Sequence, residues 1–189
     1  MKILIVGLGA IGSHVALALR NIDAELTLCD FDIIEAKNTQ AQFHLAKDIH
    51  KKKASALSRT LYGLWGLNVN PQTSKITPDN SDYLIDGQDL VLDCTDNIAA
   101  RNTIIAGCLD REIPLLHGAM SADGTFAQIT WSEDFTPDAE DGDGVTCEDG
   151  ENLPFHLLVG SQMAISVQKF IKSGKREGFI ITHSGIQRR

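Results

Sequence analysis

The apolar positions at the start of the chain change from a continuous run to a helical spacing and back. The run KILIVGLG, residues 2–9, predicts a buried strand that breaks into a glycine turn. Residues 13–22 then carry apolar side chains at helical spacing, and ELTLCD, residues 25–30, predicts a second strand. A strand, a helix and a strand in this order form a βαβ unit, which implies a parallel sheet with a right-handed crossover.

The rest of the chain continues to alternate between strands and helices. We expect a helix with a basic side at residues 46–66, a third strand at 67–77 that ends near Pro78, and a strand at 89–96 followed by its helix at 98–111. Two strands at 113–120 and 125–131 then flank the turn SADG. A helix with a glycine stop at 153–174 and a short final strand at 178–186 complete the chain. The pattern predicts an α/β fold in a single domain over residues 1–189, with a Rossmann-like, doubly wound and mostly parallel sheet.

Length and cysteine usage narrow the class of protein. A domain of 189 residues buries roughly 70% of the surface of its unfolded chain, so no disulfide or structural metal is needed for a core. The four cysteines show no CxxC spacing, and we expect reduced thiols and no structural zinc. The start lacks the basic flank and cleavage site of a signal peptide, and no apolar run approaches the roughly 20 residues of a membrane span. We therefore expect a cytoplasmic protein.

The net charge of −8 is concentrated in one segment. Residues 132–152 contain nine acidic residues and neither Lys nor Arg, which leaves 17 basic and 16 acidic residues in the rest of the chain. The composition of this segment predicts an acidic crossover loop, and we hypothesise that it favours a partner with a basic face. The basic residues are not interleaved with aromatic ones, so a nucleic-acid groove is not indicated.

The first candidate for chemistry is the glycine turn after the first strand. Gly7, Gly9 and Gly12 form GxGxxG between a predicted strand and a predicted helix, the context in which this motif binds a nucleotide. Asp30 ends the second strand, where an acid accepts hydrogen bonds from ribose hydroxyls. An NAD-linked dehydrogenase and an ATP-dependent enzyme both use such an acid, so these residues leave both classes open.

The second candidate is the sequence Asp93-Cys94-Thr95-Asp96-Asn97, which closes the strongest later strand. Ligands of parallel sheets collect at the carboxyl ends of strands, and a carboxylate there faces the phosphates of a nucleotide. Because the two anions repel unless a cation lies between them, Asp96 is a candidate Mg²⁺ ligand. The alternative is that Asp96 and Asn97 cap the helix that follows.

Four stretches of sequence carry a family resemblance. They are DFDIIEAKN at residues 30–38, Lys53 in HKKKASAL, Asn70-Pro71, and DLVLDCTDNIAARN with its Arg101. Together they resemble the ThiF/MoeB/ubiquitin-activating-enzyme-like (HesA/MoeB/ThiF) adenylyltransferases, from Lys2 to about Ser173. The resemblance implies that ATP and the C-terminal Gly-Gly carboxylate of a ubiquitin-like or sulfur-carrier protein meet at the site, with a carrier acyl-adenylate and pyrophosphate as products.

The resemblance also implies roles for individual residues. The nucleotide contacts that it implies come from Gly7, Gly9, Gly12, Asp30 (ribose), Asn38, Gln42, Lys53, Asp96 (with Mg²⁺) and Asn97. Lys53 and Mg²⁺ would stabilise the charge that develops at the phosphates, although a run of lysines is usually a solvated helix face. Cys147 stands where some relatives have a nucleophile, but Glu148 and Asp149 should raise the pKa of its thiol.

The sequence departs from the family pattern at Ala41, where an arginine ordinarily contacts the triphosphate. Its absence removes a guanidinium fork whose geometry a lysine does not reproduce. Lys37, Lys52, Arg59 or a partner subunit are candidates to supply the missing positive charge. The departure leaves a second interpretation: a non-catalytic, carrier-binding or regulatory subunit of an activating complex, in a homodimer or heterodimer. A third is another nucleotide-dependent enzyme, such as an NAD-linked oxidoreductase or a relative that acts on tRNA.

Overall fold

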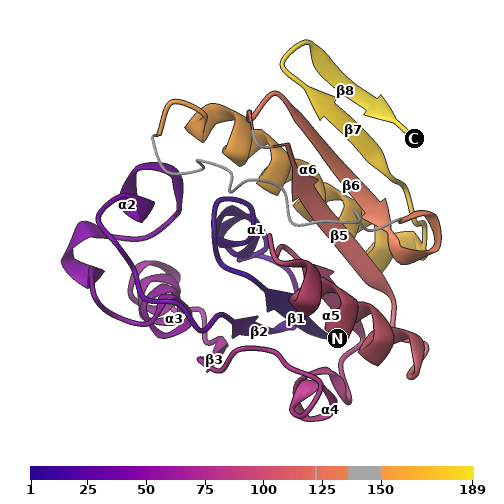
Figure 1. Ribbon diagram of the computed structural model, residues 1–189, viewed down its shortest axis with the longest axis horizontal. Coiled ribbons are helices and arrows are strands. Elements are labelled where there is room, and N and C mark those ends of the chain that lie inside the picture. Colours follow the sequence, from indigo (N-terminus) through magenta and orange to yellow (C-terminus); the bar gives the residue numbers. More distant parts are fainter. Residues whose placement is uncertain (122, 136–149) are drawn as a thin grey trace.

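The strands form one sheet that is parallel in its first part and antiparallel in its last (Figure 1). The computed structural model describes residues 1–121, 123–135 and 150–189. In the described chain the sheet has eight strands in the order β3-β2-β1-β4-β5-β6-β7-β8. Their bounds are β1 Lys2–Val6, β2 Glu25–Cys29, β3 Asn70–Gln72, β4 Leu90–Asp93, β5 Leu115–Met120, β6 Phe126–Trp131, β7 Phe179–Thr182 and β8 Gly185–Arg188.

The strand order identifies the fold class. The first five strands pair in parallel in the order 3-2-1-4-5, the arrangement of a doubly wound nucleotide-binding sheet. Strands β6 to β8 add to this sheet as antiparallel neighbours. The predicted Rossmann-like α/β fold is confirmed, and the carboxyl ends of β1, β2 and β4 meet at one edge.

Helices cover both faces of the sheet (Figure 1). The helical elements are α1 Gly12–Ala18, α2 Asn38–Ala41, the 3-10 turn η1 Ala46–Asp48, α3 Lys53–Trp65, α4 Ser81–Ile85, α5 Ile98–Leu109, the 3-10 turn η2 Ser132–Asp134 and α6 Leu153–Ser173. Successive residues of β1 enter different cores: Ile3 and Ile5 pack with α1, α3 and α6, whereas Leu4 packs with α4 and α5. A continuous apolar run fits such a strand because both of its faces are buried.

The long helix α6 follows from its sequence. Pro154 stands in its first turn, where its missing N–H costs nothing, and Gly174 stops the helix with a left-handed φ of 68°. Val159, Met163 and Val167 are spaced four residues apart and are all buried against the sheet. In the part of the chain that the structure describes, no helix is long and apolar enough to cross a membrane.

Three element predictions need correction. The helix expected over residues 46–66 is the turn η1 followed by α3, with His50 between them in the left-handed region at φ 70°. The third strand is only three residues long, because the chain leaves the sheet edge after Gln72. The short final strand is a hairpin of β7 and β8.

Candidate nucleotide-binding site

Two glycines of the turn between β1 and α1 are required by close backbone contacts. Gly7 has φ 85°, and a Cβ there would lie 2.7 Å from the Cys94 carbonyl oxygen. A Cβ on Gly12 would lie 1.9 Å from the Gly7 carbonyl oxygen. Gly9 differs, because no atom lies within 4 Å of the place of its Cβ. Gly7 and Gly12 therefore fold the turn, and Gly9 leaves its surface open.

Asp30 fixes this turn from the end of β2. Its Oδ2 accepts a hydrogen bond from the Leu8 amide at 2.7 Å, and its Oδ1 accepts one from the Asp32 amide at 2.8 Å. Burial raises the pKa of Asp30, and the nearby Lys53 ammonium partly offsets this effect. Each carboxylate oxygen has two lone pairs, so each can accept one further hydrogen bond.

Lys53 lies beside Asp30 at the first position of α3. Its side chain is only 9% exposed, and its Nζ lies 3.1 Å from Oδ2 of Asp32. The neighbouring Lys51 and Lys52 are exposed. The solvated-face interpretation therefore describes Lys51 and Lys52, whereas Lys53 points inward at the loop that follows β2.

The segment around α2 faces the glycine turn through backbone contacts and histidines. The buried Asn38 accepts a hydrogen bond from the Glu35 amide at 2.8 Å, which closes the turn before α2. Gln42 follows α2, and among the described residues its buried Oε1 has no hydrogen-bond partner. His44 donates from Nε2 to the Leu8 carbonyl oxygen at 2.9 Å, which requires the Nε2–H tautomer.

The position of the family arginine is closed. Ala41 is 0% exposed, and its carbonyl oxygen lies 3.1 Å from Nε2 of His14. Of the candidate substitutes, Lys37 lies 3.4 Å from a Glu35 oxygen, and Lys52 donates to the Phe31 carbonyl oxygen after β2. Arg59 lies in a different pocket, with Lys47 and Lys51. Of these three candidates to replace the arginine, Lys52 is the one that contacts the loop after β2, which Lys53 also contacts.

The loop after β4 presents an exposed carboxylate, that of Asp96. Asp96 is exposed, whereas the Asn97 side chain accepts from the Ala100 amide at 2.9 Å and caps α5. The capping alternative therefore describes Asn97. Among the described residues, no group of three His, Cys, Asp or Glu side chains is arranged to hold a metal. A single carboxylate nevertheless fits Mg²⁺, which is often held by one or two carboxylates together with substrate phosphates.

A buried polar network supports this loop, and it was missed by the sequence interpretation. Asp93 is fully buried; its Oδ1 accepts from the Thr95 amide, and its Oδ2 lies 2.9 Å from Arg101 Nε and 2.8 Å from His117 Nδ1. Burial by itself raises the pKa of Asp93, but the bond from His117 and the charge of Arg101 outweigh it and lower the pKa. The network could have been predicted only from the register of β4 and β5, which pairs Asp93 with His117.

The His117 ring is enclosed on its other sides. Its Nε2 lies 3.0 Å from the Ser132 hydroxyl, and the Phe135 ring stacks on it with centroids 3.9 Å apart. Because Nδ1–H donates to Asp93, Nε2 accepts the hydrogen bond from Ser132. The network therefore ties the end of β4 to the middle of β5 and to η2, which follows β6.

The cysteines of the described chain are poor nucleophiles. Burial raises the pKa of Cys29 and of Cys108 to about 12 and also raises the pKa of Cys94. Cys147 and the centre of the acidic segment, residues 136–149, lie outside the described residues. Their predicted roles remain predictions.

Fold and site geometry define a Rossmann-like α/β domain with an open glycine turn, an acid after β2 and a carboxylate after β4. The chain belongs to the ThiF family, whose sequence model matches residues 1–178. It is similar to the Escherichia coli molybdopterin-synthase adenylyltransferase, with 34% identity over 142 residues, 70% of this chain and 55% of that protein. It also resembles the E. coli sulfur carrier protein ThiS adenylyltransferase, with 31% identity over 118 residues, 61% of this chain and 47% of that protein.

A solved structure shows the same fold. E. coli MccB with ATP superposes with a TM-score of 0.77 at 18% identity, covering 100% of this chain and 62% of that chain. The chain spans about half the length of the two curated relatives above. The substrate and partners of the whole protein are therefore matters for proposal.

Proposed function

We propose that the protein uses ATP to adenylate the C-terminal glycine carboxylate of a ubiquitin-like or sulfur-carrier protein. The observation that supports this most directly is that Asp30 and Asp96 follow the carboxyl ends of β2 and β4, which flank β1 and its open Gly9, with Lys53 close to Asp30. An adenylyltransferase name is shared by both curated relatives, and one of these names specifies a sulfur carrier. The E. coli MccB structure that shares this fold was solved with ATP, which agrees with the proposal.

The nucleotide would be bound mainly by groups that folding has already placed. The open backbone at Gly9 would approach the phosphates, and the remaining lone pairs of Asp30 would accept the ribose hydroxyls. Asn38 and Gln42 would lie along the phosphate side, where their side-chain NH2 groups can donate to phosphate oxygens. Asn97 would contribute through the shape of the loop after β4, because its side chain caps α5.

In the proposed reaction a carboxylate oxygen of the carrier bonds to the α-phosphorus while the bond to the bridging oxygen breaks and pyrophosphate leaves. Negative charge grows on the nonbridging and departing oxygens, so preorganised positive charge should dominate catalysis. Lys53 would supply such charge, with Asp32 holding its ammonium at 3.1 Å before the nucleotide binds. Asp96 would hold Mg²⁺, which would lessen the repulsion between the triphosphate and the attacking carboxylate.

The test is ATP–pyrophosphate exchange with Mg²⁺ and a candidate carrier ending in Gly-Gly. We expect carrier-dependent exchange in the wild type and its loss in Asp96→Ala. Cys147→Ala should keep exchange, because a thiol can act only after the adenylate has formed. Equal loss in both variants would contradict this order of steps. Saturable NAD binding that is tighter than ATP binding and indifferent to Mg²⁺ would instead support the oxidoreductase interpretation.

A second candidate function is supported by the closed position of Ala41. Without an arginine there, the domain would bind the carrier or an active homologue and leave catalysis to a partner subunit. This non-catalytic subunit, in a homodimer or heterodimer, would bind a Gly-Gly carrier without exchange. Exchange that appears only when a second, arginine-containing homologue is added would support it.

A further inference from the structure

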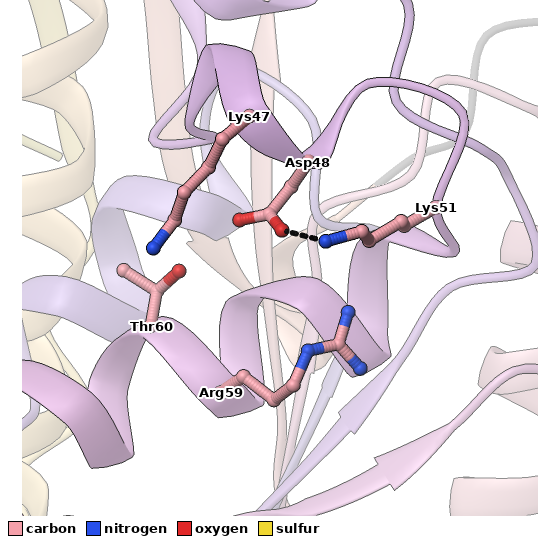
Figure 2. Close-up of a pocket in the computed structure, with 5 residues that line it drawn as sticks. All are labelled: Lys47, Asp48, Lys51, Arg59 and Thr60. Carbon is pink, nitrogen blue, oxygen red and sulfur yellow. Dashed lines mark hydrogen bonds and ion pairs between the residues drawn. The ribbon is translucent and has the colours of Figure 1, made fainter.

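A basic pocket lies between η1, the turn that follows it and α3 (Figure 2). It is lined by Lys47, Asp48, Lys51, Arg59 and Thr60. Its volume is about 280 Å³, near the lower end of the roughly 300–1,000 Å³ of small-molecule pockets. The pocket therefore suits a small ligand.

The charges around the pocket are unequal. Lys47, Lys51 and Arg59 contribute three positive charges and Asp48 contributes one negative charge, so the net charge is two positive. Asp48 is the buried member, with a side chain 6% exposed and an oxygen 2.7 Å from Lys51 Nζ. In Figure 2 its other oxygen turns toward Lys47 and Thr60, and Arg59 extends toward Lys51 from the opposite side.

The backbone holds this pocket in a defined shape. His50 adopts φ 70°, and the Lys51 amide donates to the Asp48 carbonyl oxygen at 3.0 Å. The Ile34 amide then donates to the Lys51 carbonyl oxygen at 2.9 Å, which joins the pocket wall to the loop after β2. A non-glycine residue in the left-handed region is uncommon and is retained where the surroundings determine it.

The pocket and the nucleotide site use neighbouring lysines that turn in different directions. Lys53 lies beside Asp32, and Lys51 lies beside Asp48. Arg59, a candidate to replace the charge of the family arginine, lines this pocket instead. These are two separate concentrations of positive charge.

We propose that this pocket binds inorganic phosphate, which keeps at least one hydroxyl on phosphorus at neutral pH. Arg59, Lys47 and Lys51 donate to the anionic oxygens, and a guanidinium matches phosphate geometry in a bidentate manner. The second oxygen of Asp48 accepts a hydrogen bond from the P–OH group, because an ionised carboxylate acts only as an acceptor. Sulfate has no proton at neutral pH and places a bare oxygen against Asp48, so the pocket selects against it.

Isothermal titration calorimetry with inorganic phosphate tests the proposal on the full chain. We expect saturable binding of one phosphate, with sulfate at least about tenfold weaker. Lys47→Gln and Arg59→Gln should each weaken phosphate binding by about tenfold or more, as expected for loss of a charge-assisted hydrogen bond. The control is Lys172→Gln on α6, which removes an exposed charge outside the pocket and should leave binding unchanged.

A second comparison separates the pocket from the nucleotide site. Lys53→Gln should keep phosphate binding, and Lys47→Gln should keep ATP binding. Loss of phosphate binding in Lys53→Gln, or its persistence in Arg59→Gln, would overturn the assignment to this pocket. Equal binding of sulfate and phosphate would overturn the role of Asp48. If a short single-stranded RNA bound through Lys47 and Arg59 while inorganic phosphate did not, the small-ligand assignment would be wrong.

Discussion

Asp93 and His117 share a hydrogen bond of 2.8 Å between Oδ2 and Nδ1, in a place where both side chains are buried. Arg101 contacts the same carboxylate oxygen, so one buried anion serves two partners. The arrangement holds the loop that presents Asp96 without being part of the exposed site. A substitution in this network should therefore lower the free energy of unfolding more than it changes the reaction at the exposed site.

Arg101→Met should lower the free energy of unfolding by about 3–5 kcal/mol, since it leaves a buried carboxylate without its permanent cation. The measurement is urea denaturation at neutral pH. Arg111→Met offers a matched control, because Arg111 contacts Asp82, whose side chain is 79% exposed, and such pairs contribute about 0–1 kcal/mol. A similar loss in both variants would mean that burial of the Asp93 pair is unimportant.

Stability should fall as the pH falls from about 7 to about 4, because two histidines are buried in the neutral form. Burial lowers the pKa of His44 from 6.5 to about 4 and also lowers the pKa of His14. Between these values the unfolded state binds more protons, so stability rises with pH, by about 3 kcal/mol for His44 alone. Denaturation of His44→Gln across this range should show a shallower pH dependence. If stability depends on pH equally in this variant and in the wild type, groups other than His44 cause the pH dependence.

Alanine substitutions should separate the structural glycines from the open one. Gly12→Ala should cost about 1–3 kcal/mol or prevent folding, since its Cβ would lie 1.9 Å from the Gly7 carbonyl oxygen. Gly9→Ala should change the free energy of unfolding by less than about 0.5 kcal/mol but weaken ATP binding. Thermal unfolding and a nucleotide titration check both parts. Unweakened ATP binding in Gly9→Ala would exclude close approach at this residue.

Lys53→Met should reduce ATP–pyrophosphate exchange by roughly 10²–10³, the loss seen when one transition-state donor is removed. The control is Lys172→Met, because Lys172 is exposed near the end of α6 and outside the proposed nucleotide site. Lys52→Met tests the candidate substitute for the missing arginine, and a large loss of exchange would assign that role to Lys52. A Lys53→Met rate equal to that of the wild type would remove Lys53 from the proposed reaction.

Ala41→Arg should cost about 1–3 kcal/mol of stability, because the position is 0% exposed and a longer side chain must displace its neighbours. Exchange should therefore be measured together with unfolding. Increased exchange without loss of stability would show that the site can accept the family arginine. Reduced stability with no gain would show that the surroundings have closed around alanine.

The sheet and the glycine turn could be predicted because their signals are local. A buried run, GxGxxG and a second buried run determine the order of strands around β1, and DLVLDCTD places Asp96 at the same edge. The position of Lys53 also followed from the family pattern. Its burial beside Asp32, however, depends on how the loop after β2 pairs with the start of α3.

The parts that could not be predicted depend on partners distant in sequence or on uncommon backbone geometry. Asp93 and His117 are 24 residues apart and meet only through the pairing of β4 with β5. The break at His50 follows from a left-handed turn by a residue that seldom adopts it. The closed environment of Ala41 depends on His14, which the sequence offers as one of six unassigned histidines.

Both backbone polar groups of Leu8 are hydrogen-bonded, its N–H to the Asp30 carboxylate and its C=O to the His44 ring. A turn held in this way has already lost its conformational freedom when the protein folds. Ligand binding then requires little additional ordering, so affinity depends on the contacts themselves. The same attachment should make the Leu8 amide exchange with solvent deuterium only on wide opening of the domain, even though it lies next to an open surface.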